Sequence, residues 1–262
     1  MTAHRRISFD NIQNNLSTTV LGRDLYVLDE VTSTFDACEK IGVCHGTVVC
    51  AKRQTNGTGR LGRSWESNEG GIYFSLILEP SRYGFDIQLY TLICALGVQR
   101  AISEHTACMI KWPNDIVSPD GRKLCGILTK IKLFDSKAGF INVGIGINAN
   151  NKSFSDDLKY AGSLCDFLGR EVDENRLLCS VLSEIEKVLC LSPDSLVEEF
   201  AEVCVTVGSR VKIVPADGEQ YAGNAKGISC DGSLMIEKDD GSLVCVNSGE
   251  VSVRGIYGEN YV

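Results

Sequence analysis

The chain has 262 residues, of which 44% are hydrophobic and 23% are charged, and its formal net charge is −8. This length is enough for one large and one small domain with a buried core, without disulfide staples. The acidic balance disfavours a general nucleic-acid-binding surface, because neutralising phosphates requires a basic face.

In the first part of the chain, short apolar strands alternate with helical segments. Branched and aromatic residues between turn residues indicate strands, and apolar residues three or four positions apart indicate helices. In chain order the predicted elements are a strand at 25–28, a helix at 35–41, strands at 47–51 and 71–78, a helix at 87–105, and strands at 109–112, 115–118, 123–134 and 139–147. A Ser-Pro-Asp-Gly turn at 118–121 favours antiparallel, hairpin-connected strands.

The rest of the chain changes character at about residue 208. Amphipathic helices are expected at 173–190 and 195–203, and after them short strands alternate with Asp-Gly turns at 217, 231 and 240. Turns at a spacing of about ten residues suggest a small β-barrel. We therefore predict an α+β fold with a central mixed or antiparallel sheet and helices on one face, followed by a small β-barrel. The domain boundaries are 1–206 and 207–262.

Twelve cysteines are more than usual, but no two have C-x-x-C spacing and there are only three histidines. Reduced, mostly buried thiols are expected instead of a zinc site or a disulfide framework. The N-terminus lacks the apolar run of a signal peptide, and no segment approaches the ~18 uninterrupted apolar residues of a membrane span. A cytoplasmic enzyme without membrane association is the expectation.

The loop at 53–65 reads RQTNGTGRLGRSW and contains no carboxylate. Glycines at 57, 59 and 62 allow the backbone to take positive φ and to turn amide groups towards a ligand. Arg60 and Arg63 add positive charge, and Trp65 adds an aromatic face. The loop therefore predicts a nucleotide or an acyl phosphate as ligand.

The same loop satisfies G-x-G-x-x-G, which is the pattern of dinucleotide-binding loops. Such a loop must open a helix directly after a strand, whereas here residues 63–71 continue as loop into another strand. No Gly-Lys-Ser/Thr ends it, so it is not a Walker A loop either. We reject both interpretations.

Four further segments carry groups suited to the same ligand. K-W-P-N-D at 111–115 presents an amide and a carboxylate that suit a hydrated Mg²⁺ near phosphates. R-K-L-C-G-I-L at 122–128 places Lys123 at a strand entrance, and V-G-I-G-I-N at 143–148 has two small residues on one face that could wall a flat pocket. G-E-V-S-V-R at 249–254 ends in another arginine.

Together with Ser33-Thr34 and the glycine loop, these segments resemble the biotin protein ligases, biotin–[acetyl-CoA-carboxylase] ligases, over nearly the whole chain. The resemblance implies a class II synthetase-like catalytic domain and an SH3-like C-terminal barrel. It implies the short, monofunctional class, since only about 25 residues precede the first strand. It also implies a reaction with Mg²⁺ and ATP that forms biotinyl-5′-AMP, followed by transfer to a lysine of a biotin carboxyl carrier protein, acetyl-CoA carboxylase or another carboxylase domain. Homodimerisation through a sheet edge is a further hypothesis.

The resemblance also implies roles for individual residues. Lys123 and Arg60 would be the catalytic cations. The biotin-binding residues would be Ser33, Thr34, Phe35, Gln54, Gly57, Thr58, Gly59, Arg60, Lys123, Gly126 and Gly144. The ATP and adenylate residues would be Arg60, Arg63, Trp65, Asn114, Asn148 and Arg254, and Asp115 would hold the metal through water.

Two residues depart from the family pattern. Phe35 stands where asparagine is frequent, and Thr58 stands where the loop commonly carries Arg or Lys, so one polar contact and one cationic anchor are missing. Backbone amides or Arg63 could substitute for the anchor.

The sequence alone is also compatible with simpler structural roles for these residues and with other functions. Ser33 and Thr34 fit a helix cap, Asp115 a turn carboxylate and Arg254 a rim salt bridge. The closest rival function is a lipoate ligase or octanoyl transferase. A biotin-responsive repressor is disfavoured by charge and by the missing DNA-binding extension, and a noncatalytic β-barrel module would not need this set of charged residues.

Overall fold

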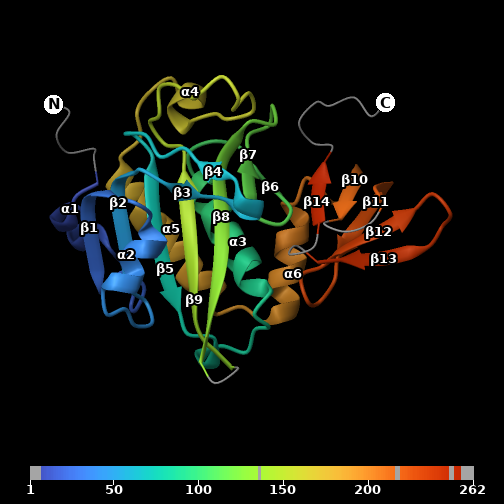
Figure 1. Ribbon diagram of the computed structural model, residues 1–262, viewed down its shortest axis with the longest axis horizontal. Coiled ribbons are helices and arrows are strands. Elements are labelled where there is room, and N and C mark those ends of the chain that lie inside the picture. The colour runs from blue at the N-terminus through green and yellow to red at the C-terminus, as the bar shows by residue number, and fades with distance from the viewer. Residues whose placement is uncertain (1–6, 135–136, 216–218, 248–250, 255–262) are drawn as a thin grey trace.

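The computed structural model describes residues 7–134, 137–215, 219–247 and 251–254, which include a seven-stranded and a five-stranded sheet (Figure 1). The larger sheet has the order β1-β2-β5-β9-β8-β7-β6. The pair β1–β2 is parallel and the other neighbours are antiparallel. The strands are β1 (Leu25–Val31), β2 (Val48–Gln54), β5 (Ile72–Leu78), β6 (Met109–Lys111), β7 (Asp115–Val117), β8 (Lys123–Phe134) and β9 (Lys137–Ile147). The predicted mixed, largely antiparallel sheet is confirmed.

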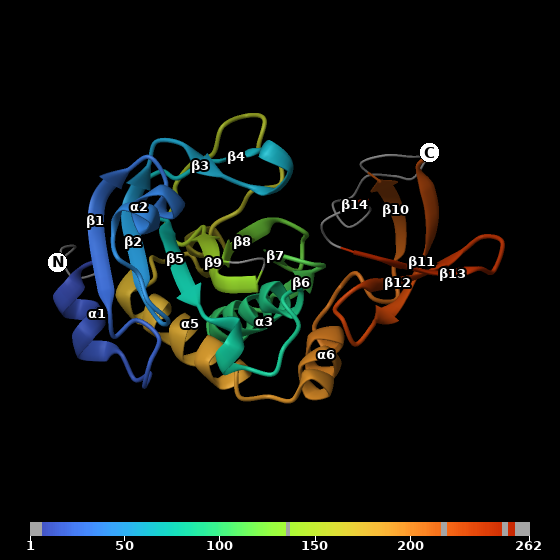
Figure 2. The ribbon, with the colours of Figure 1, turned by 60° about the horizontal axis from the view of Figure 1, so that its bottom comes forward.

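The long helices α3 (Leu89–Ser103) and α5 (Glu174–Val188) cover one face of this sheet, as Figure 2 shows. Helix α3 is buried on nearly every side, which explains why it is apolar almost throughout. Gly97 allows its close approach to α5, since a Cβ there would lie 2.8 Å from the backbone nitrogen of Ile185. Helix α1 (Phe9–Asn15) packs against α5.

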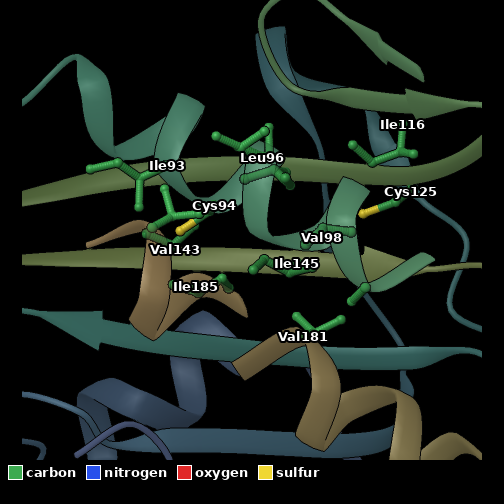
Figure 3. Close-up of a cluster of buried hydrophobic side chains, with 14 of the residues drawn as sticks. Ile93, Cys94, Leu96, Val98, Ile116, Cys125, Val143, Ile145, Val181 and Ile185 are labelled. Atoms are coloured by element: carbon green, nitrogen blue, oxygen red, sulfur yellow. The ribbon is translucent and has the colours of Figure 1, made fainter. Parts of the chain in front are cut away.

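The main core lies between α3, α5 and this face of the sheet. Figure 3 shows Ile93 and Leu96 of α3 close to Val143 and Ile145 of β9. Because side chains alternate along a strand, Gly144 and Gly146 face the other side. That side carries the short helix α2 (Thr34–Lys40), which packs with Cys38 against a smaller cluster of buried residues.

The C-terminal part has the order β13-β12-β11-β10-β14, with all neighbours antiparallel in the part of the chain described. Its strands are β10 (Arg210–Pro215), β11 (Tyr221–Ile228), β12 (Leu234–Lys238), β13 (Leu243–Val246) and β14 (Val251–Arg254). Gly232 and Gly241 take φ of +85° and +82° in two of the predicted Asp-Gly turns. The third turn, at 217–218, lies outside the described residues.

The C-terminal sheet is attached to the larger one through Trp112. Its indole Nε1 donates to the carbonyl oxygen of Gly232 at 3.0 Å, and its backbone N–H donates to Thr206 Oγ1 at 3.0 Å. Helix α6 (Pro193–Glu202) leads into this connection. Apolar residues of the C-terminal sheet, among them Val211 and Leu234, belong to the main core cluster.

The twelve cysteines are free thiols, and seven of them are buried, so the prediction of reduced, mostly buried thiols is confirmed. Burial raises the pKa of the thiols of Cys38 to about 11 and Cys94 to about 12. No helix within the described residues is both long and apolar enough to cross a membrane.

Candidate functional site

A cavity of about 410 Å³ opens on the sheet face that carries α2, over Gly144 and Gly146. Strands β8 and β9, the glycine loop and the turn before β7 surround it. The predicted site residues on its lining are Thr34, Phe35, Gln54, Thr58, Gly59, Arg60, Arg63, Trp65, Asn114, Asp115, Lys123, Gly126, Gly144 and Asn148. Residues up to 114 positions apart in the sequence, from Thr34 to Asn148, therefore meet in one pocket.

One end of the pocket is charged. Lys123 begins β8 and Asp115 begins the neighbouring β7, and Lys123 Nζ lies 2.7 Å from Asp115 Oδ1. Arg60 Nη1 donates to Asn114 Oδ1 at 3.0 Å, while Asn114 Nδ2 donates to the carbonyl of Ile127 at 2.8 Å. The two cations are thus held beside one another by partners on β7 and the turn before it.

Burial lowers the pKa of the Arg60 guanidinium, and the neighbouring Arg63 acts in the same direction. The Asp115 carboxylate opposes both effects. Arginine nevertheless stays protonated at any physiological pH. Arg60 therefore brings a partly desolvated positive charge to the pocket, where its attraction for an anion is stronger than in bulk water.

The glycine loop is folded over this end. Its pieces β3 (Gly57–Thr58) and β4 (Ser64–Trp65) pair antiparallel, and a single 3₁₀ turn, η1 (Arg60–Gly62), joins them. The Trp65 indole lies against the sheet floor, since a Cβ on Gly126 or Gly146 would come within 2.7 or 2.5 Å of it. These two glycines therefore make room for the ring.

The conformations of the loop glycines differ from the prediction. Gly62 has a positive φ of +72°, but Gly59 has φ −109°, and the other positive φ in the turn, +56°, belongs to Leu61. Gly57 is needed for a close approach, because a Cβ there would lie 2.5 Å from the Trp65 carbonyl oxygen. The strand pairing of β3 with β4 imposes this approach.

The other end of the pocket carries uncharged hydrogen-bonding groups. Gln54, the last residue of β2, accepts from the backbone N–H of Thr34 at 2.8 Å and donates to Ser67 Oγ at 2.8 Å. Thr34 Oγ1 accepts from Ser75 Oγ at 2.9 Å. Thr34 and Ser75 are 3% and 0% exposed, so this network is almost dry.

Ser33 and Gly57 are not among the described residues that line the cavity. Ser33 caps α2, since its side chain accepts from the backbone N–H of Asp36 at 3.1 Å. The contacts of Ser33 therefore support its interpretation as a helix cap. Arg254 is the last residue of β14, and its side chain lies outside the described residues.

The segment 154–161 also contributes to the cavity, through Phe154 and residues 157–161, none of which was predicted as a site residue. Lys123 N–H donates to the Tyr160 carbonyl at 2.6 Å, and Ser155 Oγ donates to Glu66 Oε2 at 2.7 Å. This segment is thereby hydrogen-bonded both to β8 and to Glu66, the residue that follows the glycine loop. Its sequence, FSDDLKYA, has no pattern that signals a site.

Asn114 and Asp115 are the candidate metal-holding residues. No cluster of three or more His, Cys, Asp or Glu suited to a metal ion occurs among the described residues. Mg²⁺, however, usually takes one or two protein oxygens and completes its shell with water and substrate phosphates. The amide oxygen of Asn114 and the carboxylate of Asp115 fit that manner of binding.

Known protein families match both the part of the chain that forms the larger sheet and the C-terminal part. Residues 28–148 match the model of the biotin/lipoate A/B protein ligase family, and residues 206–254 match the biotin protein ligase C-terminal domain. The bifunctional ligase/repressor BirA of Bacillus spizizenii is 33% identical over 252 residues, which cover 90% of this chain and 76% of the relative. The biotin–[acetyl-CoA-carboxylase] ligase of Mycobacterium tuberculosis is 28% identical and matches 79% of this chain and 78% of the relative.

The solved structure of the biotin protein ligase from Aquifex aeolicus in complex with biotin and ATP has a TM-score of 0.78 and 33% identity. The match covers 88% of this chain and 99% of that one. Sequence similarity and fold agree along both parts of the chain. The chain belongs to the biotin protein ligase family.

Proposed function

We propose that this protein activates biotin with ATP as biotinyl-5′-AMP and transfers the biotinyl group to a lysine of a carboxylase carrier domain. The observation that carries the proposal is a single pocket with two unlike ends. Lys123 and Arg60 offer positive charge at one end, and Thr34 and Gln54 offer uncharged hydrogen-bonding groups at the other. Biotin has the matching arrangement of a carboxylate on a tail and an uncharged ureido ring.

In the first step a carboxylate oxygen of biotin attacks the α-phosphorus of ATP, and the bond to pyrophosphate breaks. Negative charge develops on the phosphoryl oxygens, so positioning and fixed positive charge are the main sources of acceleration. Lys123 would bridge the carboxylate and the α-phosphate, and Arg60 would hold the same anions from the loop.

In the second step the amine of the acceptor lysine attacks the acyl carbon, the bond to the AMP oxygen breaks, and the amine loses a proton. Water would hydrolyse the same mixed anhydride. The folded glycine loop, tied to residues 154–161 through Glu66 and Ser155, would exclude water from it. Opening of this loop would admit the acceptor.

The nucleotide would lie at the charged end. Trp65 would pack against the adenine, and Asn148, whose Nδ2 donates to the Lys123 carbonyl at 3.1 Å, would contact its edge. Arg63 and Arg254 would meet the phosphates. Asp115 would hold Mg²⁺ through water, with Asn114 beside it near the phosphates, and when bound this ion would add positive charge at this end.

The uncharged end would bind the ureido ring. Burying its polar groups without partners would cost roughly 1–3 kcal/mol each, and Thr34 and Gln54, which line this end of the pocket, would supply the donors and acceptors. The lipoate ligase alternative is not favoured, because the relatives named above are biotin ligases and the C-terminal part matches a biotin protein ligase domain.

Two further features belong to the proposal. The boundary at 206/207 is supported by the start of the C-terminal family match at residue 206.

Homodimerisation would use the β1 edge of the sheet, because the β6 edge is occupied where Ile110 exchanges hydrogen bonds with Val203 and Val205. A monomer mass by light scattering at micromolar concentration would contradict the dimer.

The proposal is tested by incubating the purified protein with ATP, Mg²⁺, biotin and a carboxylase carrier domain, and measuring pyrophosphate release and the mass of the carrier. We expect biotin on one lysine of the carrier. Incorporation of lipoate in place of biotin, or no pyrophosphate release with biotin, would overturn the assignment.

A further inference from the structure

Phe35 and Lys130 form a pair at the uncharged end of the pocket. Phe35 lies in the first turn of α2, is 6% exposed and lines the cavity. Its ring rests on the floor of the pocket, since a Cβ on Gly144 would lie 2.5 Å from Cε2 and 2.6 Å from Cζ of the ring. The Lys130 ammonium lies 4.1 Å from the ring centroid. The ring therefore contacts the backbone floor and a cation at once.

The strand register explains how Lys130 reaches the ring. On β8 and β9, Leu128 pairs with Gly144 and Lys130 pairs with Asn142. Leu128 and Lys130 are two residues apart and so share a face of β8. Lys130 thus lies one step beyond the pocket floor on the neighbouring strand, from where its long side chain covers the Phe35 ring.

We propose that Phe35 is a specificity wall that limits the size of the head group accepted by the pocket, and that Lys130 is a positioning residue that holds this wall in place. The inference deepens the proposed function and rests on it. If the ligand carboxylate lies between Lys123 and Arg60, its head group lies beside Thr34, and the next residue along α2 is Phe35. An apolar ring fixed against Gly144 excludes larger head groups from this position but offers them no hydrogen bond.

The attraction between an ammonium and an aromatic face gives Lys130 this role without direct contact with the ligand. A ring restrained by Gly144 and Lys130 loses little freedom when the ligand binds. Removing the charge of Lys130 would loosen the wall and weaken binding of the head group, while the reacting groups at Lys123 stay unchanged. The expected signature is a change in KM for biotin with kcat preserved.

The test uses the full-length variants K130M, K130R and F35A, with K238M as the matched control. Lys238 lies 4.6 Å from the Tyr221 ring in the C-terminal sheet, so K238M removes a pair of the same kind away from the pocket. Pyrophosphate release is measured with biotin and with biotin sulfone, whose ring sulfur carries two additional oxygens.

We expect K130M to raise KM for biotin about three-fold with unchanged kcat, K130R to restore it, and K238M to match the wild type. We expect F35A to raise KM for biotin about ten-fold or more and to shift the kcat/KM ratio of the two acids towards the sulfone at least about five-fold. F35L, which keeps an apolar side chain on α2, should give a smaller shift in the same direction. Its thermal midpoint, measured beside that of F35A, separates pocket effects from unfolding.

The inference is overturned if the wild type and K238M use biotin, and K130M and F35L have the same KM for biotin and the same selectivity as the wild type. The same follows if K130M lowers kcat and leaves KM unchanged. If the wild type does not adenylate biotin at all, the proposed function fails instead.

Discussion

The two ends of the pocket differ in how their groups are held ready. At the charged end, Lys123 and Asp115 form an ion pair with side chains 29% and 18% exposed. At the uncharged end, Thr34 and Ser75 are buried in a network of neutral hydrogen bonds. The charged groups that must exchange partners with a ligand keep part of their side chains exposed, whereas the neutral groups at the other end are almost completely buried. This contrast would orient a molecule with one anionic and one neutral end.

The largest effect is expected from K123A, which removes the central cation of the charged end. Adenylation should fall on the order of 10³-fold, because fixed charge aimed at developing negative charge is a dominant catalytic term. Binding of biotin alone, measured by calorimetry, should fall much less, since the uncharged end is intact. The exposed pair Lys152–Glu171 offers the control K152A, which should retain full activity. An equal loss of biotin affinity and adenylation rate would contradict the division of roles.

A pair of substitutions on β9 separates the two ends. Adding a methyl group at Gly146 would push on Trp65, and adding one at Gly144 would push on Phe35, each from 2.5 Å. Overpacking costs about 1–3 kcal/mol. We expect G146A to raise KM for ATP, and G144A to raise KM for biotin, each by roughly 10- to 100-fold. The two positions share a strand and a face, so each variant controls for the other. A reversed pattern would refute the assignment of the ends.

A smaller effect is expected from D115N, which removes the negative charge of Asp115 and leaves a side chain of nearly the same size and shape. The Mg²⁺ concentration for half-maximal adenylation should rise about ten-fold, as for the loss of one metal-supporting group. Excess Mg²⁺ should recover most of the rate. Asp120, which pairs with Arg122 on a nearby turn, provides the control D120N. A rate loss that Mg²⁺ does not relieve would show that Asp115 serves only to position Lys123.

The smallest effect is expected from Q54L at the uncharged end. It removes the acceptor of the Thr34 N–H and the donor to Ser67. Both of these bonds lie within the protein, and the loss of one hydrogen bond to the ureido ring, at about 1 kcal/mol, corresponds to roughly five-fold in KM for biotin, with KM for ATP unchanged. Gln13, which donates to the Gly22 carbonyl away from the pocket, gives the control Q13A. A rise in KM for ATP as large as the rise in KM for biotin would contradict the assignment of separate ends to the two substrates.

The parts predicted from the sequence are those with a local signature. Gly144 and Gly146 stood out because small residues at alternate positions of an apolar strand leave room over one face. The segment at 154–161 was missed because its place at the pocket comes from the bond of Tyr160 to β8, which no local pattern reveals. The short helices α1 and α4 (Leu164–Leu168) were missed for a similar reason, since tertiary contacts rather than apolar periodicity stabilise them. The Lys130–Phe35 contact depends on strand register and is equally invisible in the sequence.

Trp112 is one of the residues that fix the C-terminal sheet to the strand leading to Asn114. The indole needs the turn at Gly232, whose left-handed backbone turns the carbonyl towards it. For protein engineering, this means that the C-terminal part is not a freely exchangeable cassette. A chimera that replaces it must bring a turn of the same geometry, or the donor tryptophan must be redesigned with it.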